Sequence, residues 1–186
     1  MMKMTSNVAS VLGLSALVLA LMMPNAQAKP PKFAQKSDQS IVEFAIGASG
    51  GAADLDDNGE DFDVLIAALL ATGVVTAFDG TDYTVFAPND QAFWDLTGTT
   101  NDADAVNAAI SALGVEGIAG VLLYHVTEGV RNSRSVTRAR QVEMLDGNTI
   151  SYDGMIIANN SDAMILDADN RLADGMVHVI DTVLLP

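Results

Sequence analysis

Hydrophobic residues recur every three or four positions through much of the first half of the chain. This spacing predicts helices over residues 40–49, 61–73, 89–96 and 102–114. Ser40 is placed to cap the first helix, and Asn89 or Asp90 to cap the third. Gly73 and Gly114 offer C-terminal stops for the second and fourth helices.

The second half of the chain has a different pattern, with short apolar runs separated by Gly-, Asp- and Asn-rich turn signals. It predicts strands over residues 141–145, 149–152, 155–159, 163–168 and 176–185, with an earlier strand at 83–88. Residues 117–126 are expected to begin as helix or coil and to end as strand. Helices followed by strands, without an internal repeat, predict one α+β domain with helices gathered on part of an antiparallel sheet system.

The N-terminus has the pattern of a segment that is removed. Lys3 precedes an uncharged run over residues 8–23, and Ala26-Gln27-Ala28 follows. These features predict a secretory signal peptide over residues 1–28. A membrane anchor is the alternative, although the apolar run is shorter than the roughly 20 residues that a span needs. We expect a flexible lead-in over 29–38, a domain over 39–186, and a secreted or periplasmic protein.

The charge is strongly acidic and unevenly placed. Nine Lys and Arg against 24 Asp and Glu give a net charge of −15. Loss of Lys3 with the signal peptide leaves 8 − 24 = −16. Such a chain repels nucleic acid and anionic lipid surfaces, so we expect neither partner and no membrane insertion after signal removal. Without cysteine, the core must hold the fold alone.

No Lys or Arg occurs from residue 37 to residue 130, and then four arginines follow within ten residues: Arg131, Arg134, Arg138 and Arg140. This run is either a solvated face that offsets the acidic surface or a docking patch for an anionic partner such as an acidic polysaccharide.

Three segments in order resemble signatures of the fasciclin domain family. They are YTVFAPNDQAF at residues 83–93, LLYHV at 122–126 and GMVHVIDTVLLP at 175–186. Residues 62–75 also look like the family's first long helix, so the resemblance covers about residues 39–186. It implies a wedge-shaped β-sandwich with several packed α-helices, found in secreted and cell-surface proteins that serve adhesion and matrix contacts. The signature residues that it singles out are Phe86, Pro88, Asp90, Phe93, Tyr124, His125, His178 and Asp181.

The sequence departs from the family's pattern in one signature position. Asn89 stands where the family usually has Thr or Ser, and it keeps a side chain that can cap a helix. The chain has no Arg-Gly-Asp sequence, so the integrin contacts of animal members are not assumed here.

His125 is the first candidate for chemistry. On an extended segment, Tyr124 and His125 would point to opposite faces, and a buried imidazole would stay neutral and need a hydrogen-bond partner. Asp90 or a backbone carbonyl could be that partner, with Asp90 the first choice. The imidazole then either joins core segments or takes a catalytic or ligand role; we expect the former.

His178 and Asp181 lie in a run that is apolar on both faces, as in a central strand buried on two sides. On one strand they would point to opposite faces and could not chelate one metal, and Asp181 would need a partner. The chain has no cysteine and no His-Glu-x-x-His motif, while a carboxylate pair of the glycosidase type stays open.

One loop resembles the opening of a calcium-binding loop. Asp54, Asp56 and Asn58 occupy positions one, three and five, Gly59 occupies position six and Glu60 follows. The loop departs from that pattern at position twelve, where Leu65 replaces a bidentate Glu. It is either a weak surface calcium site or an acidic loop without metal.

Together these features predict a non-enzymatic domain that acts by binding and needs no cofactor, most simply in adhesion to an extracellular protein or polysaccharide. The alternative is a soluble module for a carbohydrate or another ligand, possibly assisted by calcium, and an acid-rich hydrolase is a third reading.

Overall fold

The structure is a computed structural model that describes residues 36–51, 53–77 and 81–186. The predicted signal peptide and most of the lead-in lie outside the described residues. The helices are α1 (Ile41–Ala48), α2 (Asp63–Thr72), the 3-10 helix η2 (Val74–Ala77), α3 (Asp90–Thr97), α4 (Asp102–Leu123) and α5 (Ser133–Arg138). The strands are β1 (Tyr83–Pro88), β2 (Val126–Glu128), β3 (Val142–Glu143), β4 (Thr149–Tyr152), β5 (Ile156–Ile157), β6 (Asp162–Ala163), β7 (Ile165–Leu172) and β8 (Gly175–Ile180).

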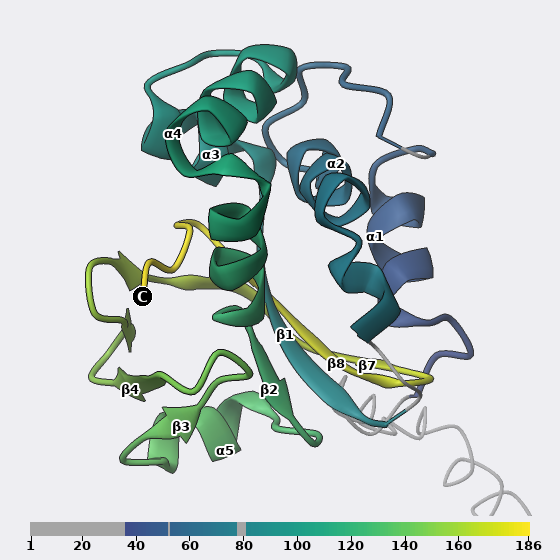
Figure 1. Ribbon diagram of the computed structural model, residues 1–186. Helices are drawn as coiled ribbons and strands as arrows, with labels where there is room; N and C mark the ends of the chain where they lie inside the picture. The colour runs from purple at the N-terminus through teal and green to yellow at the C-terminus, as the bar shows by residue number, and fades with distance from the viewer. Residues whose placement is uncertain (1–35, 52, 78–80) are drawn as a thin grey trace, which may run out of the picture.

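The strands form two four-stranded sheets, in the orders β2-β1-β8-β7 and β3-β4-β5-β6. Helices α1 to α4 lie on one side of the first sheet, and the second sheet with α5 lies on the other (Figure 1). The α+β class predicted from the sequence is therefore confirmed. The first sheet is covered on both faces, because Val85 and Val177 belong to the core shared with the helices, whereas Phe86 and Ile180 belong to the core shared with the second sheet.

The central pair of the first sheet differs from the predicted antiparallel system. Strands β1 and β8 run parallel over six residue pairs, from Tyr83↔Gly175 to Pro88↔Ile180. Parallel neighbours need a long crossover, and here residues 89–174, more than half of the domain, lie between them. The first pair is very close: a Cβ at Gly175 would overlap the backbone oxygen of Tyr83, so this position requires glycine.

Local capping signals place several helix ends correctly. Ser40 accepts from the Glu43 N–H in a full capping box, Asn89 caps α3, and Gly73 ends α2 in the left-handed region at φ 68°. At Gly114, φ 67° and ψ 172° break α4, as the sequence indicated, but the helix resumes and continues to Leu123. Although α4 is long and apolar enough to cross a membrane, this break divides it into two shorter segments.

Three predictions about the strands are wrong. Tyr124 is helical (φ −70°, ψ −10°) and β2 begins only at Val126, so Tyr124 and His125 do not lie on a strand. The Asp- and Asn-rich run DADN at residues 167–170, one of the turn signals between the predicted strands, is instead an irregular part of β7, whose pairing with β8 shifts register there. The last strand ends at Ile180, so Asp181 lies beyond it.

Candidate functional site

The signature residues of β1 and β8 lie at the centre of the fold. Phe86 is fully buried and stacks on His178, with 5.5 Å between ring centroids and 27° between planes. Their strands pair Phe86 directly with His178. Pro88 ends β1, and in the helix that follows Phe93 is buried while Trp94 is half-buried. Phe86 and His178 therefore lie at the contact between β1 and β8, and Pro88 and Phe93 lead from β1 into α3.

Asp90 closes the N-terminus of a different helix. Phe62, the N-cap of α2, makes no side-chain cap, and Asp90 accepts from the Asp63 N–H at 2.8 Å and the Val64 N–H at 2.9 Å instead. Asp90 is thus the cap that α2 lacks in its own sequence. Burial and the neighbouring Asp61 carboxyl raise the pKa of Asp90 to about 8, against the effect of these two bonds.

The expected bond between His125 and Asp90 is absent. The Nδ1 of His125 lies 2.7 Å from the Val121 carbonyl oxygen, and its Nε2 accepts from the Leu184 N–H at 2.9 Å. Because a carbonyl can only accept, Nδ1 carries the proton and Nε2 is the acceptor. Both nitrogens are therefore used by the backbone, and His125 links the end of α4 to the C-terminal segment.

Burial lowers the pKa of His125 to about 4. The second proton of an imidazolium would also sit on Nε2, facing the N–H of Leu184, where it would replace a hydrogen bond by a contact between two donors. The imidazole of His125 is therefore neutral in the folded protein near neutral pH.

His178 is also buried and bonded to backbone groups, but its proton lies on Nε2, whereas that of His125 lies on Nδ1. Its Nε2 lies 2.8 Å from the Arg131 carbonyl oxygen, and its Nδ1 accepts from the Asp169 N–H at 3.2 Å. Burial lowers its pKa. The Asp181 carboxylate, which the sequence predicted to need a partner, accepts a hydrogen bond from the Met164 N–H at 2.8 Å.

Tyr124 is fully buried in the core between the sheets, whereas His125 faces the core on the helix side. The Tyr124 hydroxyl donates to the Thr149 carbonyl at 3.1 Å and accepts from the Asn159 N–H at 3.3 Å. The two residues do point to different cores, but both lie in the turn after α4 and not on a strand.

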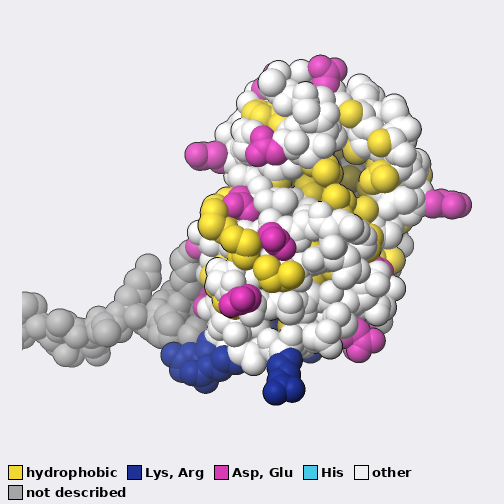
Figure 2. All heavy atoms as spheres, turned by 90° about the vertical axis from the view of Figure 1, so that its left-hand side faces the viewer, with side chains coloured by type: hydrophobic (Ala, Val, Ile, Leu, Met, Phe, Trp, Pro, Cys, Tyr) yellow, Lys and Arg dark blue, Asp and Glu magenta, His cyan; other side chains and the backbone are white. Residues whose placement is uncertain are grey.

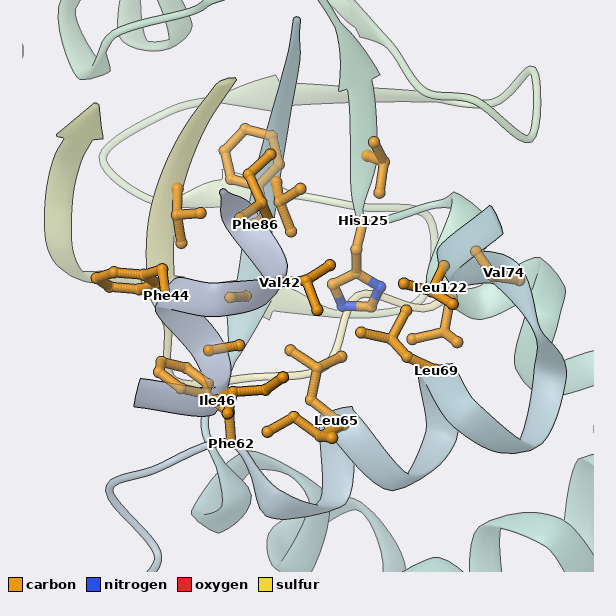
Figure 3. Close-up of a pocket in the computed structure, with 18 of the residues that line it drawn as sticks. Val42, Phe44, Ile46, Phe62, Leu65, Leu69, Val74, Phe86, Leu122 and His125 are labelled. Atoms are coloured by element: carbon orange, nitrogen blue, oxygen red, sulfur yellow. The ribbon is translucent and has the colours of Figure 1, made fainter. Parts of the chain in front are cut away.

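An apolar cavity of about 150 Å³ lies between α1, α2 and the first sheet. Figure 3 shows Val42, Leu65, Leu69 and Leu122 around the ring of His125. Because both ring nitrogens already have backbone partners, the cavity offers no free polar group from His125. Its size suits one benzene-sized apolar group and its lining does not suit a sugar.

More carboxylates gather around the acidic loop than the calcium-loop pattern of the sequence includes. One oxygen from each of Asp54, Asp56 and Asp63 lies within 4.8 Å of the others, and the same holds for Asp61, Asp63 and Asp90. The sequence pattern missed Asp61, Asp63 and Asp90, although the absence of Lys and Arg nearby was a signal.

The other candidates in this loop have local roles. The Asn58 side chain accepts from the Glu60 N–H and donates to Asp61 Oδ2, and the Glu60 carboxylate belongs to neither group. Hydrogen bonding and burial beside Asp63 raise the pKa of Asp54.

The arginine run surrounds α5. Arg134, Arg138 and Arg140 are exposed, and within the described part of the chain they form no ion pair. Arg131 is half-buried and belongs to the patch only in part. Figure 2 shows the Lys and Arg side chains of one face at its lower end, the end that carries α5 in Figure 1, with acidic side chains spread over the rest.

Comparison with known families matches the fasciclin domain to residues 60–186. Protein sll1483 from Synechocystis is 31% identical over 157 residues, which are 82% of this chain and 77% of that protein. Human periostin is 30% identical over 132 residues, 68% of this chain but 15% of its own length. The chain belongs to the fasciclin domain family.

Among solved structures, a domain pair of the insect cell adhesion molecule Fasciclin I shares 18% identity and a TM-score of 0.47. The match covers 63% of this chain and 43% of that structure, so the chain spans less than half of it.

Proposed function

We propose that this protein is a secreted, non-enzymatic adhesion domain that binds an anionic extracellular polymer through Arg134, Arg138 and Arg140. The observation that carries the proposal is the segregation of charge. Three exposed arginines, which form no ion pair with any described residue, lie at one end of a chain with a net charge of −15. Membership in the fasciclin domain family supports the adhesive role.

The geometry of α5 suits such a contact. Arg134 and Arg138 are four residues apart and therefore share a face of the helix, and Arg140 follows two residues after its end. At physiological ionic strength the Debye length is about 8 Å, so acids elsewhere on the molecule are largely screened from a polymer bound at this end. Guanidinium groups also bind carboxylates and sulfates in a bidentate way.

A non-enzymatic role is supported by the two histidines. All four of their ring nitrogens have backbone partners, which leaves neither ring free to act as a general base.

The test is binding of the chain from residue 29 to immobilised alginate, with neutral dextran as the control polymer. We expect salt-sensitive binding to alginate that the variant Arg134→Gln/Arg138→Gln/Arg140→Gln loses. A matched variant, Asn107→Glu/Ser111→Glu/Ala112→Glu, changes the net charge equally at exposed positions of α4 and should bind alginate as the wild type does. Equal binding by the arginine variant, or equal loss in both variants, contradicts the proposal.

The cavity of Figure 3 favours a second candidate, a binding module for a small apolar ligand. Benzene, used as the probe in a calorimetric titration, should bind the wild type, and Val42→Phe, which fills the cavity, should abolish that binding. Unchanged probe binding in Val42→Phe would remove this candidate.

A further inference from the structure

We propose that Asp61, Asp63 and Asp90 bind a calcium ion, and that Asp54 and Asp56 complete the site on its solvent side. The site lies where the loop after α1 meets the first turns of α2 and α3. Figure 1 places this region at the end of the molecule opposite α5, so the proposal does not rest on the arginine patch.

The spacing of the oxygens fits one ion. Calcium binds oxygen at about 2.3–2.6 Å, so two ligands of the same ion can be at most about 5 Å apart. The carboxylates of Asp61, Asp63 and Asp90 offer oxygens within 4.8 Å of one another. Asp63 meets the same criterion with Asp54 and Asp56, and it therefore connects the buried carboxylates to the exposed ones.

Two of these carboxylates carry an oxygen that no protein group satisfies. Asp63 is fully buried and Asp61 is 4% exposed, yet Oδ1 of each has no hydrogen-bond partner among the described residues. Their Oδ2 atoms are occupied, by the Asp56 N–H and the Asn58 amide. Buried carboxylate oxygens are normally paired, so these two point to a ligand that supplies positive charge.

Among the residues that the structure describes, no cation pairs with these acids. No Lys or Arg occurs from residue 37 to residue 130, and the ion pair between Arg171 and Asp82 involves none of them. Five carboxylates around one point would repel one another unless a cation or protons neutralise them.

The chemistry of the ligands favours calcium over magnesium. Calcium accepts six to eight oxygens in irregular geometry, including several carboxylates, whereas magnesium demands an octahedron and keeps several waters. A buried carboxylate triad next to two exposed carboxylates matches the first description. Bound calcium would fasten the loop to α2 and α3, because Asp61 lies in the loop, Asp63 in α2 and Asp90 in α3.

The test is calorimetric titration of the chelator-treated protein with CaCl₂ and, separately, MgCl₂, together with its melting temperature. We expect heat with calcium, little with magnesium, and a rise in melting temperature of about 5–10 °C when calcium exceeds its Kd a hundredfold. Absence of heat and of a melting shift at millimolar calcium, or equal effects of both metals, overturns the proposal.

Variants locate the site. Asp61→Asn keeps the size of the side chain and removes one charged ligand. It should weaken calcium binding at least about tenfold, because even residues that only orient a metal ligand cost about that much when they are lost. Without calcium, Asp61→Asn should melt above the wild type, because one buried like charge is gone; a merely structural aspartate would give the reverse. Glu60→Gln makes the same charge change in the same loop outside both carboxylate groups and should bind calcium normally. Unchanged affinity in Asp61→Asn, or equal loss in Glu60→Gln, overturns the assignment.

Discussion

Acidification should destabilise this protein through His125, by an amount that the structure allows us to work out. The folded state lowers the pKa of His125 from 6.5 to about 4 because the ring is buried. Below pH 6.5 the unfolded chain therefore binds a proton that the folded chain does not. The contribution of His125 to the free energy of unfolding is complete above pH 6.5 and is lost as the pH falls to about 4. At 1.36 kcal/mol per pKa unit, the loss is about 3 kcal/mol.

Other groups titrate in the same range, so the measurement must isolate His125. Burial also lowers the pKa of His178, which acts in the same direction. The raised pKa of Asp90 acts in the opposite direction, since its contribution is present at low pH and is lost as the pH rises to about 8. The difference between the wild type and His125→Gln removes both effects, because the variant retains His178 and Asp90.

The assay is urea unfolding at steps from pH 7.5 to pH 4, followed by the emission of Trp94. The free energy of unfolding of the wild type relative to His125→Gln should fall by about 3 kcal/mol across this range. Should the variant not fold, NMR titration of the wild type gives a second measure, with His178→Gln assigning the two imidazole signals. A constant difference between the proteins, or a His125 signal that titrates near pH 6.5, would refute the reasoning.

Three further substitutions test the packing, each by urea unfolding. Gly175→Ala should lose at least about 2 kcal/mol, because its Cβ would meet the Tyr83 backbone in the β1–β8 pair, and a loss below 0.5 kcal/mol would contradict this close approach. Gly120→Ala, inside α4 with nothing within 4 Å of a new Cβ, should instead gain about 0.5–1 kcal/mol; a loss would mean that this part of α4 is not regular helix. Tyr124→Phe should lose about 1 kcal/mol by leaving the partly buried Thr149 carbonyl and Asn159 N–H without the hydroxyl, whereas an unchanged midpoint would show that water replaces it.

The sequence was most informative where the signal is local. Ser40, Asn89 and Gly73 were identified as helix ends because a cap depends on a side chain and the backbone within a few residues of it. The strand at residues 83–88 was equally local, since an apolar β-prone run is closed there by Pro88.

The errors came from contacts between distant residues. The parallel pairing of β1 with β8 joins segments about 90 residues apart, and no local pattern distinguishes it from antiparallel pairing. Asp90 was the first choice as the partner of His125, with a backbone carbonyl as the alternative. The Val121 carbonyl is that partner, and Asp90 caps the start of α2 instead. The carboxylate cluster was missed in the same way, because it needs Asp90 beside Asp61 and Asp63.

The buried histidines and the buried aspartates of the acidic loop differ in how completely their polar atoms are hydrogen-bonded, and this difference indicates where a ligand would bind. His125 and His178 have all their nitrogens paired with backbone groups in the tautomers that those groups require. Asp61 and Asp63 each retain a buried oxygen that has no hydrogen-bond partner in the described part of the chain. A fold able to satisfy two imidazoles completely could have replaced either aspartate by an apolar residue and avoided a desolvation cost of about 1–3 kcal/mol. Departures such as a buried polar atom without a hydrogen-bond partner are expected chiefly at functional sites. The contrast between unsatisfied carboxylates and satisfied histidines supports the proposal of a calcium site at the acidic loop and of a structural role for the histidines.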